Sequence, residues 1–142
     1  MQTNDIDILA RTIYGEARGE YGGIGRIASL IAVGNVVMNR VKARGRYGRT
    51  IQEVCQKPWQ FSCWNEGDPN RSVIIRDVID DPIYALCREV AINVSREQWP
   101  DLTKGSDHYH ASTIPVLPRW AATIKPSVCL GKHVFYQLSR GE

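Results

Sequence analysis

The sequence lacks a long apolar run and a leader segment. No stretch approaches the ~20 apolar residues that cross a bilayer, and the start, MQTNDIDILA, has no positively charged segment followed by an apolar one. We therefore expect no membrane insertion and no signal peptide. The 142 residues, 43% of them apolar, are enough to bury one core. We expect a single domain, 1–142, and a monomer.

Basic runs and nucleotide-binding motifs are also missing. The formal charge is only +3, and the lysines and arginines are scattered rather than gathered in an arm or stripe. We therefore do not expect nucleic acid as a partner. The sequence has no G-x-S-x-G elbow, no P-loop and no dinucleotide-binding glycine fingerprint, which argues against serine hydrolase, nucleotide and nicotinamide chemistry. No cofactor is expected.

Cysteine is sparse. Four cysteines without a C-x-x-C pair are too few for a disulfide scaffold at this length. Cys55 and Cys63 flank an aromatic loop, so a disulfide between them could close it. Cys87 lies on the apolar side of a predicted helix, where we expect it to pack as a small hydrophobic residue.

Apolar residues at three-and-four spacing predict most of the secondary structure. They indicate a helix from Asn4 or Asp5 to about Gly19 and a buried central helix over 25–42. The predicted elements that follow are a short helix from the capping box at Thr50, a loop over 57–72, a weak helical segment over 73–79, a helix from Asp81-Pro82 to about Arg96, and loops with a small hairpin or two short strands beyond it. The predicted fold class is mainly α (α+β).

Two glutamates of the motif YGEARGE are predicted to share the inward face of the first helix. Glu16 follows Ile13 by three residues and Leu9 by seven, and Glu20 lies one turn further on. Burial favours the protonated form of a carboxyl group, which is the form that a general acid needs. The alternative is that both glutamates form surface ion pairs with Arg11, Arg18 or Arg26. Periodicity alone leaves both interpretations open.

Aromatic and amide side chains gather around the predicted loops and helix ends. Flat aromatic faces can stack on the apolar face of a ligand, while amides and hydroxyls can recognise sugar hydroxyls and acetamides. Each aromatic taken singly is better explained as core, but together with an inward acid the set favours a carbohydrate cleft. The residues are Tyr14, Trp59, Phe61, Trp64, Tyr109 and Trp120, with Asn35, Gln52, Gln60, Ser62 and Asn65.

The segment SDHYHAS raises a second possibility. His108 and His110, with Asp107 nearby and His133 later in the chain, could bind zinc. A His-x-His pair alone lacks a fixed third ligand, and alternation in an extended segment would also place both histidines on one side merely to line a groove. We expect no metal, and we keep a zinc-dependent amidase or peptidase as an alternative.

Four blocks of the sequence occur together and in a fixed order. They are LARTIYGEARGE (9–20), GNVVMNRV (34–41), QFS (60–62) and the stretch from HYHAS through PRWA to GKHVFY (108–136). In these blocks the chain resembles the cell wall hydrolases typified by the catalytic domain of the spore cortex-lytic enzyme SleB. The resemblance implies a compact, lysozyme-like, mostly helical domain that acts on the glycan strands of peptidoglycan, with Glu16 as the catalytic acid.

The resemblance implies one of two reactions at the bond between N-acetylmuramic acid and N-acetylglucosamine. A lytic transglycosylase, which we prefer, gives 1,6-anhydro products and needs one carboxylate. A hydrolytic lysozyme would need a second carboxylate, ~5 Å away if retaining or ~6.5–9.5 Å away if inverting, for which Glu20 is the local candidate. The residues expected to line the groove are Tyr14, Gln60, Phe61, Ser62, Tyr109, His110 and Trp120.

The expected lack of a signal peptide suggests how such an enzyme would reach its substrate. It favours a phage lysis enzyme that acts from the host cytoplasm after membrane permeabilisation, or an enzyme carried on a virion. A third hypothesis is a non-catalytic wall-binding module, for which the aromatics would matter and Glu16 would not.

Overall fold

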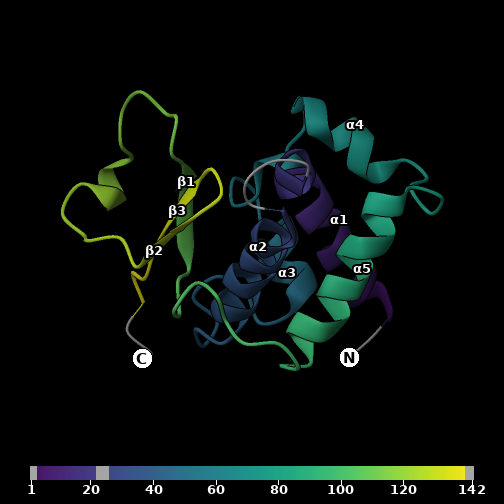
Figure 1. Cartoon of the computed structure of the whole chain (residues 1–142), viewed down its shortest axis with the longest axis horizontal. Helices are drawn as coiled ribbons and strands as arrows, with labels where there is room; N and C mark the ends of the chain where they lie inside the picture. Colours follow the sequence, from purple (N-terminus) through teal and green to yellow (C-terminus); the bar gives the residue numbers. More distant parts are fainter. Residues whose placement is uncertain (1–2, 22–25, 140–142) are drawn as a thin grey trace.

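Helices form the first two thirds of the chain and a small sheet forms the last third (Figure 1). The computed structural model describes residues 3–21 and 26–139, and for Thr3, Glu20 and Tyr21 it describes the backbone only. The elements are α1 (Thr3–Tyr21), α2 (Arg26–Val41), α3 (Ile51–Gln56), the 3-10 turn η1 (Ser62–Trp64), α4 (Pro69–Ile75), α5 (Pro82–Ser95), β1 (His108–Ala111), the 3-10 turn η2 (Arg119–Ala121), β2 (Val128–Leu130) and β3 (His133–Tyr136). Within the described ranges, no helix combines the length and apolarity needed to cross a membrane.

The central helix is α2, as predicted. Its apolar residues Leu30, Val33 and Val36 are fully buried, and it packs against both α1 and α5. In Figure 1 the sheet lies beside this helical group, at the end of the molecule opposite α5. The expected mainly α fold with short strands in the C-terminal third is therefore confirmed.

Side-chain caps start α3 and α5 where the sequence predicts them. The hydroxyl of Thr50 accepts the backbone N–H of Glu53 at 3.1 Å, which satisfies one of the free donors of the first turn. At α5, a carboxylate oxygen of Asp81 accepts the N–H of Ile83 at 2.8 Å, with Pro82 at the first helical position. Both helices begin at the predicted residue.

The start of α4 differs from the prediction. We expected a weak helical segment over 73–79, but the helix covers Pro69–Ile75. The reason is a second aspartate-proline pair, Asp68 and Pro69, in which the carboxylate of Asp68 accepts the N–H of Asn70 at 2.8 Å. The turn-rich surroundings of this pair concealed the same start signal that was recognised at α5.

The sheet has three antiparallel strands in the order β1-β3-β2. A small hairpin or two short strands were expected, so the sheet has one strand more than predicted. Its register pairs Tyr109 with Phe135 and His110 with Val134. Because neighbouring residues of a strand face opposite sides, Tyr109 and Phe135 share the face that packs against the helical core, and His108 and His110 lie on the other.

Two asparagines of α2 fasten the connection between α5 and β1. The side-chain oxygen of Asn35 accepts the N–H of Leu102 at 3.0 Å. The amide of Asn39 donates to Asp101 and to the carbonyl of Ser106, each at 2.9 Å. The side-chain oxygen of Asn35 and the amide of Asn39 therefore serve the fold by fixing this connection.

All four cysteines are free thiols. Cys55, Cys63 and Cys87 are buried, while Cys129 is exposed. Burial raises the pKa of Cys55 and of Cys87 to about 12, which keeps both thiols protonated at neutral pH. The predicted role of Cys87 as a small hydrophobic residue is confirmed, and no disulfide joins Cys55 to Cys63.

The buried carboxylate of Asp107 ties the first strand to the end of the chain. It accepts the ring N–H of His108 at 2.9 Å and the backbone N–H groups of Leu138 and Ser139 at 2.9 and 2.8 Å. Burial by itself would raise the pKa of Asp107, but these hydrogen bonds outweigh it and hold the pKa well below its usual value. The charged form of Asp107 therefore stabilises the fold.

We predict that Asp107→Asn lowers the free energy of unfolding by about 2 kcal/mol at neutral pH, because an amide accepts fewer of these bonds. The folded-state pKa of Asp107 lies below its unfolded value, so its stabilisation is present above about pH 4 and is lost as the pH falls further. Urea unfolding between roughly pH 2 and 6 should show the two proteins converging in acid. Parallel curves would contradict this assignment.

Candidate active site

The site depends on a close approach between α1 and η1. A Cβ atom at residue 15 would lie 2.8 Å from Cβ of Cys63 and 2.8 Å from a methyl group of Ile74, so only glycine fits there. This contact brings the backbone of Cys63 to the next residue of α1. The N–H of Cys63 donates to Oε2 of Glu16 at 3.4 Å.

The sheet approaches Glu16 from another direction. The hydroxyl of Tyr109, on β1, donates to Oε1 of Glu16, so each carboxyl oxygen is held by a different element. Glu16 is half-buried and borders a hollow of about 270 Å³. The other residues that line this hollow are Gly15, Arg18, Gly19 and Asn70.

The alternative ion-pair interpretation is wrong for Glu16 as far as the structure describes the chain. Arg11 pairs with Asp7 at 3.0 Å, and Arg18 donates to the side chain of Asn70 at 2.8 Å. Among the ion pairs of the described residues, none includes Glu16. Glu20 lies in the last turn of α1, and its side chain is outside the described part.

Tyr109 is suited to remain a hydrogen-bond donor. Burial raises the pKa of its phenol, and the negative charge of Glu16 and the hydrogen bond to it raise the pKa further, well above the ordinary value. The nearby guanidinium of Arg40 opposes these effects without reversing them. Tyr109 is therefore protonated throughout the neutral pH range and can support Glu16 whether its carboxyl group is charged or neutral.

Arg40 of α2 connects the two sides of the site, which are the start of β1 and the segment before η1. This role was not predicted from the sequence. Arg40 is 6% exposed, and burial lowers its pKa. Its Nε atom donates to the carbonyl of Asp107 at 2.7 Å, just before β1, and its Nη1 atom donates to the side chain of Gln60 at 3.0 Å. The available signal was an arginine three residues after Val37 and four after Val36, on the buried stripe of the central helix.

Two predicted groove residues are packed inside the protein instead. Phe61 is 1% exposed, and the guanidinium of Arg40 lies 4.9 Å from the centre of its ring. Tyr14 is 3% exposed, and its hydroxyl donates to Asp81 at the start of α5. The burial of both rings argues against their predicted role in binding substrate.

Gln60 and Ser62 lie on the segment that carries Cys63. The side-chain oxygen of Gln60 is engaged by Arg40, which makes Gln60 part of the wall that supports the site. Ser62 is exposed at the start of η1, directly before Cys63. Of the two, Ser62 is the better placed to contact a ligand, and its predicted role stays a prediction.

His110 and Trp120 belong to an aromatic cluster on the face of the sheet opposite Tyr109. His110 donates from Nδ1 to the carbonyl of Ala111 at 2.8 Å, so Nε2 accepts the hydroxyl of Tyr136 at 2.9 Å. The ring of Trp120 lies 5.1 Å from that of Tyr136 and 6.0 Å from that of His110. This cluster holds the segment between β1 and β2. The predicted role of His110 and Trp120 in lining the groove stays a prediction.

The register of the sheet argues against the zinc alternative. His133 pairs with Ala111, which faces the same side as Tyr109, whereas His108 and His110 face the other. The three histidines therefore do not converge on one point. In the described ranges, no group of three histidine, cysteine, aspartate or glutamate side chains is arranged to hold a metal ion.

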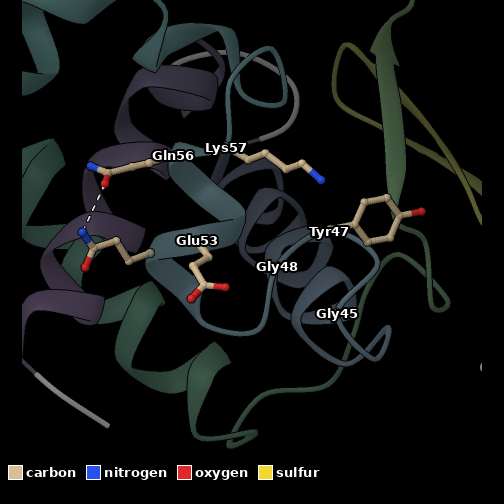
Figure 2. A pocket seen from close by; sticks show the side chains of 7 residues that line it. Gly45, Tyr47, Gly48, Glu53, Gln56 and Lys57 are labelled. Carbon is tan, nitrogen blue, oxygen red and sulfur yellow. Dashed lines mark hydrogen bonds between the residues drawn. The ribbon is translucent and has the colours of Figure 1, made fainter.

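A larger hollow, about 630 Å³, lies between the turn after α2 and α3 (Figure 2). Figure 2 shows Glu53, Lys57 and Tyr47 around it. Its carboxylate, Glu53, already accepts the N–H of Arg49 at 2.9 Å, and the hydroxyl of Tyr47 is hydrogen-bonded to Ser139 at 3.1 Å. These groups hold turns and caps together, so Glu16 remains the better candidate for chemistry.

Glu16 is half-buried and borders a hollow, so a ligand bound there could come within reach of its carboxyl group, as a candidate general acid requires. The Cell Wall Hydrolase family matches residues 27–136, and the chain belongs to this family. The match begins after α1, so it does not include Glu16.

Two solved structures are similar over almost the whole chain. The catalytic domain of the Bacillus cereus SleB protein has 25% identity and a TM-score of 0.69, over 96% of this chain and 91% of that one. The catalytic domain of the germination-specific lytic transglycosylase SleB from Bacillus anthracis has 25% identity and a TM-score of 0.68, over 96% and 97%. Both alignments are long enough to include α1. None of the curated proteins compared with the chain matches it.

The contact at Gly15 predicts a sharp contrast between the two glycines of α1. Gly15→Ala should lower the free energy of unfolding by about 1–3 kcal/mol, because its methyl group overlaps Cys63 and Ile74. Gly19→Ala meets nothing within 4 Å and should raise it by up to about 1 kcal/mol through helix propensity. Urea denaturation measures both. Equal effects of the two substitutions would contradict the packing argument.

Proposed function

We propose that this cell wall hydrolase is a peptidoglycan lytic transglycosylase in which Glu16 acts first as acid and then as base. The bond cleaved joins N-acetylmuramic acid to N-acetylglucosamine, and the product carries a 1,6-anhydro ring. The observation that carries the proposal is the position of Glu16, between Tyr109 and Cys63 on the edge of a hollow. The likeness to the lytic transglycosylase SleB from Bacillus anthracis supports it.

In the first step Glu16 gives its proton to the oxygen of the glycosidic bond, and the bond from that oxygen to C1 of the muramoyl sugar breaks. Oε1 is held by Tyr109, whereas the bond from Cys63 to Oε2 is long at 3.4 Å. Oε2 is therefore the better oxygen to carry the proton. The two donors then stabilise the carboxylate that forms, and because they are already in place they need no reorganisation.

In the second step the carboxylate accepts the proton of the muramoyl C6 hydroxyl while that oxygen attacks C1. The new C1–O6 bond closes the anhydro ring, and Glu16 regains its proton. No water is consumed and one carboxylate is sufficient. Glu16 lines the hollow, and the transglycosylase route needs no second acid, whereas hydrolysis would.

The remaining expectations about the protein's setting stay predictions. They comprise a single domain and a monomeric state, the lack of a nucleic-acid partner, and a phage lysis or virion-borne role. None of them is needed for the reaction proposed at Glu16.

We predict that Glu16→Gln lowers activity on purified sacculi at least ~100-fold, because an amide cannot donate the proton. Mass spectrometry of the released muropeptides should show 1,6-anhydromuramic ends for the unchanged protein. Glu20→Gln is the matched variant, one turn along the same helix, and should remain within a few-fold of full activity.

Two outcomes would contradict this proposal. Activity that survives Glu16→Gln would remove the catalytic assignment. Reducing ends among the products, together with loss of activity in Glu20→Gln, would instead indicate a hydrolytic lysozyme with two carboxylates.

Tyr109→Phe should lower kcat by roughly 10- to 100-fold with little change in KM. The substituted ring keeps its contacts with Phe135 and His133, whose ring centres lie 5.5 and 4.9 Å away, but it no longer donates to Glu16. Tyr136→Phe is the matched control, because it removes a hydroxyl from the other face of the sheet. An equal loss of kcat in both variants would show that the effect is structural.

A further inference from the structure

Trp59 occupies a turn position that favours glycine. The N–H of Gln60 donates to the carbonyl of Lys57 at 3.2 Å, which closes a four-residue turn with Pro58 in its second position. Trp59, in the third position, has a φ of 67°, as in a type II turn, where a residue with a Cβ atom is strained. The side chain of Asn65 accepts the N–H of Trp59 at 3.2 Å and holds the turn in place.

The tryptophan gains nothing from the protein's own packing. Its side chain projects from the turn and the residue is 83% exposed. A large apolar ring in solvent, on a backbone that would be relaxed with glycine, has no explanation within the fold. A ligand that contacts this ring would account for its position.

The surface beside Trp59 has the composition of a sugar-binding site. A hollow of about 470 Å³ is lined by two aromatic rings together with proline, amide and carboxylate groups. The second ring, Trp64, is fixed because its indole N–H donates to Thr12 at 2.9 Å. Flat rings beside amide and carboxylate groups suit the apolar face and polar rim of a pyranose. The lining residues are Gln56, Pro58, Trp59, Trp64, Asn65 and Glu66.

Residues of this hollow contact the same helix and the same 3-10 turn as the candidate active site. Trp64 directly follows Cys63, whose N–H contacts Glu16. Thr12, which accepts the indole N–H of Trp64, lies four residues before Glu16 on α1, about 6 Å along the helix axis. A polymer with a linkage at Glu16 extends in both directions past the neighbouring surface. A glycan strand is therefore the occupant that this proximity favours.

We propose that Trp59 and Trp64 form a subsite for a sugar of the glycan strand at a distance from the bond that is cleaved. This inference rests on the proposed function, since it takes the same polymer as the ligand. The subsite contributes to the binding of long strands and takes no part in the chemistry at Glu16.

The test measures binding to purified sacculi in a Glu16→Gln background, in which the substrate is not consumed. Trp59→Gly should weaken binding roughly tenfold, while its stability is unchanged or higher because glycine accepts the positive φ. Trp59→Tyr, which keeps a flat ring, should recover much of the binding. Ile79→Ala, which alters another apolar residue, 72% exposed on a loop before α5, is the matched control and should bind normally.

Catalysis and fluorescence provide further readouts. With Glu16 restored, Trp59→Gly should raise KM for long glycan fragments and have less effect on KM for fragments too short to reach Trp59 from the cleaved bond. Long fragments should also protect the fluorescence of the unchanged protein from acrylamide, and this protection should be smaller without Trp59. Normal binding by Trp59→Gly, or an equal defect in Ile79→Ala, would overturn the subsite, whereas persistent activity of Glu16→Gln would overturn the proposed reaction.

Discussion

The close contact between Gly15 of α1 and Cys63 of η1 is the constraint on which the site depends. It lets a loop backbone lie directly on a helix, at a distance that any side chain at residue 15 would prevent. The N–H of Cys63 thereby reaches the carboxyl group of Glu16, which follows Gly15 in the chain. A carboxyl group that is partly removed from water needs such donors. The lack of a side chain at Gly15 is therefore what allows the hydrogen bond from Cys63 to Glu16.

Arg40 links this part of the site to the sheet. It bonds the segment before η1 through Gln60 and the start of β1 through the carbonyl of Asp107. A buried cation is costly unless its donors are satisfied, and here the acceptors come from both walls of the site. The segment before η1 and the start of β1 are therefore both held to the central helix. These bonds from α2 help to fix the position of Tyr109 relative to Glu16.

Sequence analysis predicted the parts of the fold that depend on local signals. Helical periodicity located α1, α2 and α5, and the caps at Thr50 and Asp81 located two helix starts. The aspartate-proline pair at Asp68 is the same kind of helix start. It was not predicted because turn-forming residues surround it, and their composition favours a loop. Glu16 could be selected as a candidate because its carboxylate interrupts the apolar stripe of the first helix, and a helical wheel shows such an interruption.

The errors at the site have a different physical origin. Alternation along HYHAS separates Tyr109 from its two histidine neighbours, but it does not indicate which face of the strand will meet the helices. That choice depends on the burial of Phe135, whose partner across the sheet is Tyr109, and hence on a pairing between segments more than twenty residues apart in the chain. For the same reason the sequence could not show that the ring of Phe61 is covered by the guanidinium of Arg40, a residue 21 positions earlier in the chain. Long-range pairing thus decides which residues contact Glu16. Composition alone cannot decide this, because it makes every aromatic residue an equal candidate for the site.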